Sequence, residues 1–213
     1  MRRILTHVDC TLISHLHFDH FSFGSLDELP KDGILVIADG LADYTPEFGF
    51  AETDELKTWE SVERNGLRIT AVPAQHFNGR YGFDMLWMGD RGYTGYVVEY
   101  HGTTVYFAGD TGYNPTIFKE IGRRFKVDVA LIPIAPGAGI GAGSRVHVNP
   151  SGAVKILEDV GAKFMIPMHF GTMYYGSNPN PAAQIAELRD AAKSEGVADR
   201  VLVLEVGEQR VIY

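Results

Sequence analysis

Short apolar runs rich in β-branched residues recur along the chain, and each of them predicts a β-strand. The predicted strands cover residues 8–13, 34–38, 67–72, 96–100, 104–108, 127–132, 164–168 and 201–206. His101 and Gly102 separate two of these runs, which predicts a tight hairpin turn between them.

Helical patterns lie between the predicted strands. Ser25 precedes Glu28 by three residues, which is the spacing of a capping box and predicts the start of a helix. Two further apolar patterns begin at a proline and end at a glycine, over residues 150–161 and 181–196. Strands first follow strands and then alternate with helices, which predicts one layered α/β domain over residues 1–213.

Two long segments carry no predicted element, namely residues 39–55 and 76–95. The second segment is rich in glycine and aromatic residues. Long loops in a compact domain are often functional, so we expect these two to contribute to a site.

Composition narrows the class of protein. Hydrophobic residues make up 45% of the 213 positions and charged residues 22%, which is typical of a globular domain. The formal net charge of -8 argues against a nucleic-acid partner. The single cysteine, Cys10, excludes an intramolecular disulfide, and no apolar run approaches the ~18 residues of a membrane span. We therefore expect a soluble cytoplasmic protein.

A dense group of metal-ligand residue types follows the first predicted strand: His15, His17, Asp19 and His20. Imidazole is the commonest protein ligand for metals, and a carboxylate adds a hard oxygen donor with negative charge. If the strand continues to His15, then His15 and His17 point to the same side. A turn at Phe18 would aim Asp19 and His20 at a second point nearby, so one run can supply two metal positions.

Three further candidate ligands lie within four residues after the ends of other predicted strands: His76, Asp110 and His169. Strand ends gather at one edge of a layered α/β fold, so we expect these side chains to meet the first group. Two divalent cations would bring four positive charges, of which Asp19 and Asp110 neutralise two. The remaining excess would lower the pKa of a bound water and attract an anionic substrate.

In order and spacing, the candidate ligands resemble those of the metallo-β-lactamase-fold hydrolases, from about residue 8 to residue 213. The flanking residues resemble the N-acylphosphatidylethanolamine phospholipase D branch of those hydrolases. The matching segments are Pro73-Ala74-Gln75-His76, Phe107-Ala108-Gly109-Asp110-Thr111-Gly112-Tyr113, His147-Val148-Asn149-Pro150 and His169-Phe170-Gly171-Thr172.

This resemblance implies an αββα sandwich with two zinc ions at its edge and a hydroxide between them that attacks the substrate. The implied ligands are His15, His17 and His76 for the first metal, Asp19, His20 and His169 for the second, and Asp110 as a bridge to both. Zinc is the usual metal of the family, and the mixture of histidine and aspartate also suits iron or manganese. Asp19, Asp110 and His147 are the residues that we expect to take part in catalysis.

Two features depart from the family pattern. Only fourteen residues precede His15, whereas the family has opening strands there that lie beside the first predicted strand of this chain. We therefore expect a first sheet without those strands, whose edge is covered by a second copy of the chain, is locally rearranged, or belongs to a protein that starts further upstream. Position 149 is asparagine where close relatives have aspartate, which bears on substrate or proton handling.

Other residues have a functional and an ordinary interpretation. His147 either holds a substrate oxygen or donates a proton to a leaving group, or it is a capping or surface histidine. Arg80 either pairs with a phosphate or is a solvated loop arginine. Trp87, Tyr174 and Tyr175 either line an apolar substrate groove or pack in the interior.

The sequence thus predicts hydrolysis of a phosphodiester in an anionic, lipid-like substrate by water that the metals activate. The alternative within the enzyme class is a lactonase or another ester hydrolase, because one fold and one metal pair serve many bonds. A third hypothesis is an inactive, truncated remnant that still binds metal.

Overall fold

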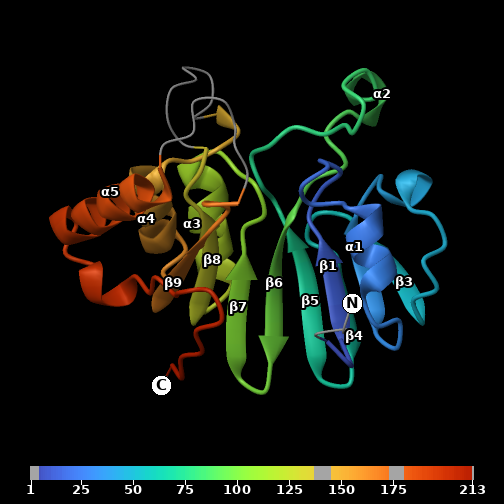
Figure 1. The fold of residues 1–213 in the computed structure, drawn as a ribbon, viewed down its shortest axis with the longest axis horizontal. Coiled ribbons are helices and arrows are strands. Elements are labelled where there is room, and N and C mark those ends of the chain that lie inside the picture. Colours follow the sequence, from blue (N-terminus) through green and yellow to red (C-terminus); the bar gives the residue numbers. More distant parts are fainter. Residues whose placement is uncertain (1–4, 137–144, 173–179, 213) are drawn as a thin grey trace.

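The computed structural model describes residues 5–136, 145–172 and 180–212. Two β-sheets face each other, and helices cover their outer faces (Figure 1). The small sheet is parallel throughout and has the order β1 (Cys10–Ile13), β2 (Ile34–Ala38), β3 (Glu52–Leu56). β1 is therefore an edge strand, as the sequence predicts.

The large sheet has six strands in sequence order, and the direction of its strands determines where the site forms. The strands are β4 (Ser61–Arg64), β5 (Leu67–Val72), β6 (Gly95–Tyr100), β7 (Thr103–Phe107), β8 (Val129–Pro133) and β9 (Phe164–Met168). β6 runs antiparallel to both β5 and β7, while β7, β8 and β9 are parallel. The carboxyl ends of β5, β7, β8 and β9 therefore share one edge of the sheet.

The two sheets meet across an apolar layer. Ile34 and Val36 of β2 pack against Ile69 of β5 and Tyr96 of β6 in one buried cluster. The hydroxyl of the fully buried Tyr96 donates a hydrogen bond of 2.9 Å to the carbonyl of Ile13, which satisfies this polar atom and ties the large sheet to the end of β1.

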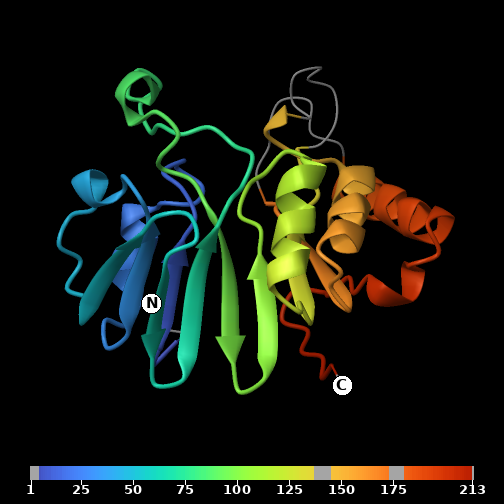
Figure 2. The same ribbon diagram turned by 180° about the vertical axis from the view of Figure 1, so that it is seen from behind.

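Helices bury the outer face of each sheet. α1 (Phe23–Glu28) packs Leu26 on the small sheet beside Leu35 and Ile37. Three longer helices cover the large sheet, as Figure 2 shows from behind: α3 (Pro115–Arg124), α4 (Pro150–Asp159) and α5 (Pro181–Ser194). The resulting order of layers is helix, sheet, sheet, helix, which confirms the αββα sandwich. None of these helices is long and apolar enough to cross a membrane within the described ranges.

Most predicted elements are confirmed, with small shifts at their ends. Seven of the eight predicted strands exist, the helices that start at Pro150 and Pro181 exist, and β6 and β7 form the predicted hairpin. The exception is the strand expected over residues 201–206. Only Val201 forms a bridge, to Met165, and Val206 is fully exposed, so this segment is not a strand.

Several elements differ from the sequence prediction or were missed. The N-cap of α1 is Ser22, which accepts from the backbone of Ser25, so the helix starts one turn earlier than the predicted capping box. Part of the segment expected to be a loop over residues 39–55 is a 3-10 helix (Ala42–Tyr44) and the start of β3. The loop over residues 76–95 contains α2 (Met85–Met88), and β4 and α3 were not expected.

Candidate metal centre

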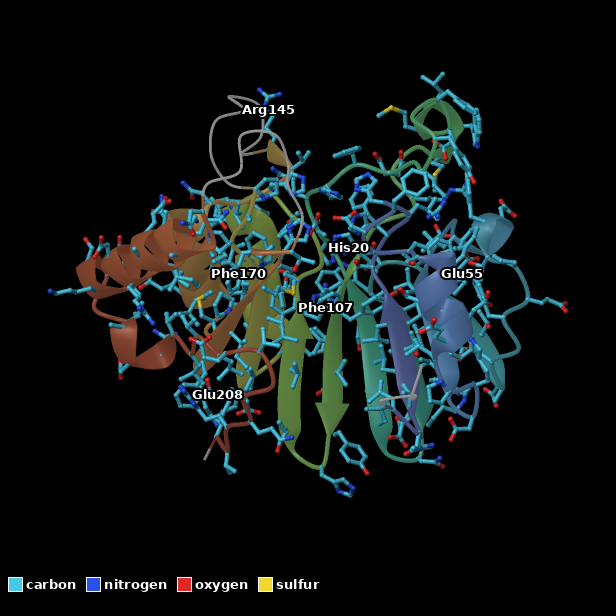
Figure 3. All side chains as sticks on the ribbon, viewed as in Figure 1. His20, Glu55, Phe107, Arg145, Phe170 and Glu208 are labelled. Atoms are coloured by element: carbon cyan, nitrogen blue, oxygen red, sulfur yellow. The ribbon has the colours of Figure 1, made fainter. Side chains whose placement is uncertain are left out.

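All seven predicted ligands meet at the edge where the strands end. Figure 3 shows His20 above the strands, between the half of the molecule with α1 and the half with α4. β1 leads into the first ligand segment, β5 leads to His76, β7 to Asp110 and β9 to His169. The shared edge of the parallel strands therefore gathers residues from distant parts of the sequence, as predicted.

The first group of ligands consists of three imidazoles. The Nδ1 atom of His17 lies 3.0 Å from Nε2 of His15 and 3.2 Å from Nε2 of His76. On its other side, His76 donates from Nδ1 to the carbonyl of Val146 at 2.8 Å. This bond fixes the tautomer and leaves the lone pair of Nε2 directed at the group, which is the usual way in which a protein orients a metal-binding histidine.

The second group combines a carboxylate with two imidazoles. Oδ2 of Asp19 lies 3.3 Å from Nε2 of His169 and 3.5 Å from Nε2 of His20. His169 donates from Nδ1 to the carbonyl of Ala135 at 2.7 Å, which again leaves Nε2 facing the group. Each group contains three ligand atoms close enough for one cation.

Asp110 lies between the two groups. Its Oδ2 atom is 3.4 Å from the Nε2 atoms of His20 and His169, and 4.0 Å from those of His15 and His76. One carboxylate oxygen is thus within reach of both positions. The arrangement matches the bridging role that the resemblance implies.

The residues present fit a pair of cations. The side chain of Asp110 is 2% exposed, and its Oδ1 atom has no hydrogen-bond partner, like the buried Nε2 of His20 and Nδ1 of His147. A buried charge and convergent lone pairs without partners cost free energy unless something compensates them. Divalent cations would provide that compensation, and the mixed nitrogen and oxygen donors would suit zinc, iron or manganese.

The protonation of the imidazoles agrees with this interpretation. Burial lowers the pKa of His76 to about 3, and it also lowers the pKa values of His15 and His17, so these rings are neutral and able to bind metal. Burial acts in the same direction on His20. The carboxylates of Asp110 and Asp19 outweigh it and raise the pKa of His20 to about 9. A cation bound by His20 would take the place of that proton.

His147 belongs to the same cluster. Its Nδ1 atom lies 3.6 Å from Oδ2 of Asp110, and together with His76 and Asp110 it forms a further group with ligand spacing. Burial lowers the pKa of His147, so the ring is neutral at pH 7. Asn149, two residues later, caps α4 by accepting from the backbone of Gly152 at 2.8 Å, so its side chain serves the helix.

A cavity of about 400 Å³ opens beside the cluster. The polar residues Asp110, His147 and His169 form part of its lining. The apolar residues Phe18, Phe77 and Met85 form another part of the wall. The three apolar residues were not predicted individually. The aromatic and glycine-rich composition of the loop over residues 76–95 was the available signal for two of them.

Most of the exposed large apolar side chains among the described residues lie around this cavity. We call them the apolar lip: Phe18, Phe77, Tyr81, Phe83, Met85, Leu86 and Trp87. Ring contacts link Phe18 to Tyr81 and Tyr81 to Phe83, each at 6.3 Å between centroids. A clustered apolar surface at a polar site indicates a binding role rather than chance exposure.

The predicted substrate-binding residues have different surroundings. Arg80 lines the cavity, and its Nη1 atom donates to the carbonyls of Leu16 and Phe21. Trp87 is 60% exposed and belongs to the apolar lip, outside the lining of the cavity. Tyr174 and Tyr175 lie outside the described residues.

Comparison with known proteins assigns the fold and this cluster to a family. The sequence matches the Beta-lactamase superfamily domain over residues 1–170. The chain belongs to this family. A metal-dependent hydrolase of Methanopyrus kandleri is 32% identical over 202 residues, which cover 94% of this chain and 80% of that protein. Family and cluster together describe a metal-dependent hydrolase of the metallo-β-lactamase fold.

Two further known proteins resemble this chain, one in sequence and one in structure. The mitochondrial N-acyl-phosphatidylethanolamine-hydrolyzing phospholipase D of Saccharomyces cerevisiae is 32% identical over 176 residues. The match covers 77% of this chain but only 36% of the yeast protein. The structure of an isothiocyanate hydrolase from Delia radicum gut bacteria superposes with a TM-score of 0.73 at 22% identity, covering 96% of this chain and 77% of that one, which shows the shared fold.

Proposed function

We propose that this protein is a dinuclear zinc hydrolase that cleaves a phosphodiester in a lipid-like substrate. The observation that carries the proposal is the position of Asp110, whose single Oδ2 atom lies within 4.0 Å of ligand nitrogens from both groups. A site with two groups of ligands around one shared carboxylate is built for two cations, and seven ligands exceed the roughly four that one zinc ion takes.

The cations, the two carboxylates and His147 have separate tasks in this proposal. The cations, when bound, polarise the scissile group and lower the pKa of water. Asp110 and Asp19 supply two negative charges and leave a net positive site that attracts an anionic group. His147 lines the cavity and is neutral, so it can accept a proton or hold a substrate oxygen through its N–H.

The apolar surroundings of the cluster support a lipid-like substrate. Phe18, Phe77 and Met85 belong both to the wall of the cavity and to the apolar lip, so apolar surface continues from the metal cluster to the outside. A substrate with a polar group at the metals and an apolar chain along this surface would use both parts. The name of the yeast relative, a phospholipase D, agrees with such a substrate.

Hydrolysis of a lactone or another carboxylic ester is the second candidate. Arg80 is the one arginine or lysine among the described residues that line the cavity, and two of its N–H groups already bind backbone carbonyls. A phosphodiester would therefore rely on the cations for most of its charge neutralisation, whereas an uncharged ester needs no further cation.

A panel of substrates with the zinc-loaded protein distinguishes these functions. We expect turnover of bis-p-nitrophenyl phosphate and of phosphatidylethanolamine derivatives, with a higher kcat/KM for the lipids. Faster turnover of an acyl homoserine lactone would favour the second candidate. Two tightly bound metals without turnover of any substrate would favour the inactive remnant and contradict the proposal.

A further inference from the structure

The guanidinium of Arg80 binds the turn that carries three metal ligands, one of the first group and two of the second. Its Nη1 atom donates to the carbonyl of Leu16 at 3.1 Å and to the carbonyl of Phe21 at 2.8 Å. Leu16 and Phe21 are fully buried, so water cannot readily replace Arg80 as their partner. These two carbonyls flank the segment that contains His17, Asp19 and His20; His17 begins the turn, and the two ligands of the second site lie within it.

The flanked segment is a short helical turn with its own hydrogen bonds. The backbone amides of His20 and Phe21 both donate to the carbonyl of His17, at 3.0 Å and 2.8 Å. These bonds set the shape of the turn but leave its orientation to contacts outside it. Arg80 supplies such contacts at both ends, and from these we propose that Arg80 is a positioning residue that holds Asp19 and His20 in the geometry of the second metal site.

The way in which the charge of Arg80 is stabilised supports this role. The guanidinium carbon lies 4.3 Å from the ring centroid of Phe18, within the turn, and 4.4 Å from that of Phe23, at the start of α1, so two rings enclose it. No ion pair joins Arg80 to an aspartate or glutamate among the described residues. The cation therefore orders the turn without competing for the carboxylate of Asp19.

The backbone of Arg80 is itself held in place. Asp84 is buried, with 1% of its surface exposed. Its carboxylate accepts hydrogen bonds from the backbone amide of Arg80 at 2.8 Å and from that of Tyr81 at 3.0 Å. Arg80 also follows His76, a ligand of the first group, by only four residues. One loop thus contributes a ligand to the first metal site and a support to the second.

The contacts of Arg80 agree less well with a role in direct binding of a substrate anion. Both hydrogens of Nη1 are directed at backbone carbonyls, and the Nε atom is buried without a partner. Only the two hydrogens of Nη2 remain for an anion. Arg80 therefore cannot form the bidentate hydrogen bonds through Nε and Nη by which arginine binds a phosphate. The inference concerns metal binding and does not depend on which bond the enzyme cleaves.

The test compares Arg80→Met, which keeps much of the volume, with Arg80→Lys and with a matched control. Arg124→Met is the control, because Arg124 also lies over an aromatic ring, that of Trp59 at 4.0 Å, but on α3 away from the cluster. Zn²⁺ affinity at the two sites is measured by competition with a chromophoric chelator, and kcat and KM are measured separately.

We expect Arg80→Met to weaken one of the two zinc sites by roughly 10–100-fold, the effect of losing a residue that orients a ligand. Arg80→Lys should recover part of the affinity, because an ammonium can bind the carbonyls but does not stack between the rings. Arg124→Met should leave both sites as in the wild type. In an Asp19→Ala background, Arg80→Met should have little further effect, since both changes act on the same site.

Three results would overturn the proposal: equal weakening of both sites, unchanged affinity at both sites, or a higher KM with both metals retained. The last would assign Arg80 to substrate binding instead. If Arg80→Met does not fold, Phe18→Leu removes one of the enclosing rings at a position that is 62% exposed. That variant should weaken the same site to a smaller extent, and an unchanged affinity would again count against the proposal.

Discussion

Oδ2 of Asp110 lies 3.4 Å from Nε2 of His20, in a region where the aspartate side chain is almost completely buried. The contact joins residues that are 90 positions apart, and it forms because β1 and β7 end at the same edge of the molecule. Asp110 adds a negative charge to both groups, which otherwise consist mainly of neutral or cationic imidazoles. This charge is needed to offset the charge of bound cations.

The first prediction concerns this charge. We expect Asp110→Asn to release both metals more easily and to lower kcat/KM by at least ~100-fold, because an amide offers no charge to offset two cations. Elemental analysis and steady-state kinetics on the same sample measure the two effects. Normal metal content with normal turnover would show that Asp110 is only a turn residue.

The second prediction concerns Gly109, which precedes this aspartate. Its φ is +61°, and a Cβ atom here would lie 2.9 Å from Cβ of Ser14. Gly109→Ala should therefore lower the free energy of unfolding by about 1–2 kcal/mol from backbone strain alone and also displace Asp110, which weakens metal binding. Gly102→Ala is the matched control, because Gly102 has a φ of +81° but no atom within 4 Å of the added Cβ.

Both glycine variants should lose stability in denaturant unfolding, but only Gly109→Ala should lose metal. Equal metal affinity in the two variants would mean that the approach of Gly109 to Ser14 does not position the ligand.

His147 provides the third prediction. Its neutral ring lines the cavity at 3.6 Å from Asp110 and lies outside the seven predicted ligands, so we expect it to act on the substrate rather than to hold a metal. We expect His147→Ala to retain both metals and to slow hydrolysis by ~100-fold, the lower end of the effect of a general acid or base. The control is His7→Ala, at an exposed histidine that bonds Asp32 far from the cluster. Loss of one metal from His147→Ala would instead make His147 a ligand.

The fourth prediction concerns stoichiometry. We expect two equivalents of metal per chain in the active protein, because the ligands form two groups around Asp110. Removal with a chelator should abolish activity, and titration with Zn²⁺ should restore it only as the second equivalent binds. Full activity at one equivalent would contradict the dinuclear site.

The position of the ligands was predictable from sequence because each one follows an apolar run. The runs before His76, Asp110 and His169 consist mainly of apolar or β-branched residues and each contains buried positions, which makes them recognisable as strands. Parallel neighbours then bring the following residues to one edge, whatever the details of the packing. The contact partners of these ligands, such as Val146 for His76, are backbone carbonyls that no side-chain pattern reveals.

The differences between the predicted and observed elements have separate physical origins. β3 reads Glu-Thr-Asp-Glu-Leu and lies at the edge of its sheet with mostly exposed side chains, so it shows no apolar face. α3 could have been predicted from Asn114 and Pro115, a capping residue followed by proline at the first helical position. For residues 201–206 the apolar pattern was misleading, because Val201 and Val203 pack half-buried against the core without forming more than one bridge to the sheet.

The fifth prediction concerns the free edge of the small sheet. Among the described residues, β1 pairs only with β2, and beside it an opening between the sheets is lined by Cys10, Leu12 and Ile69. An unpaired strand edge next to apolar surface favours association, so we predict that the protein self-associates through β1, with a mass that rises with concentration in light scattering. Leu12→Lys should shift the protein towards the monomer, because it places a charge at this opening, whereas Val206→Lys, at an exposed apolar position elsewhere, should not. A cooperative, well-dispersed monomer at all concentrations would show that this edge does not mediate association.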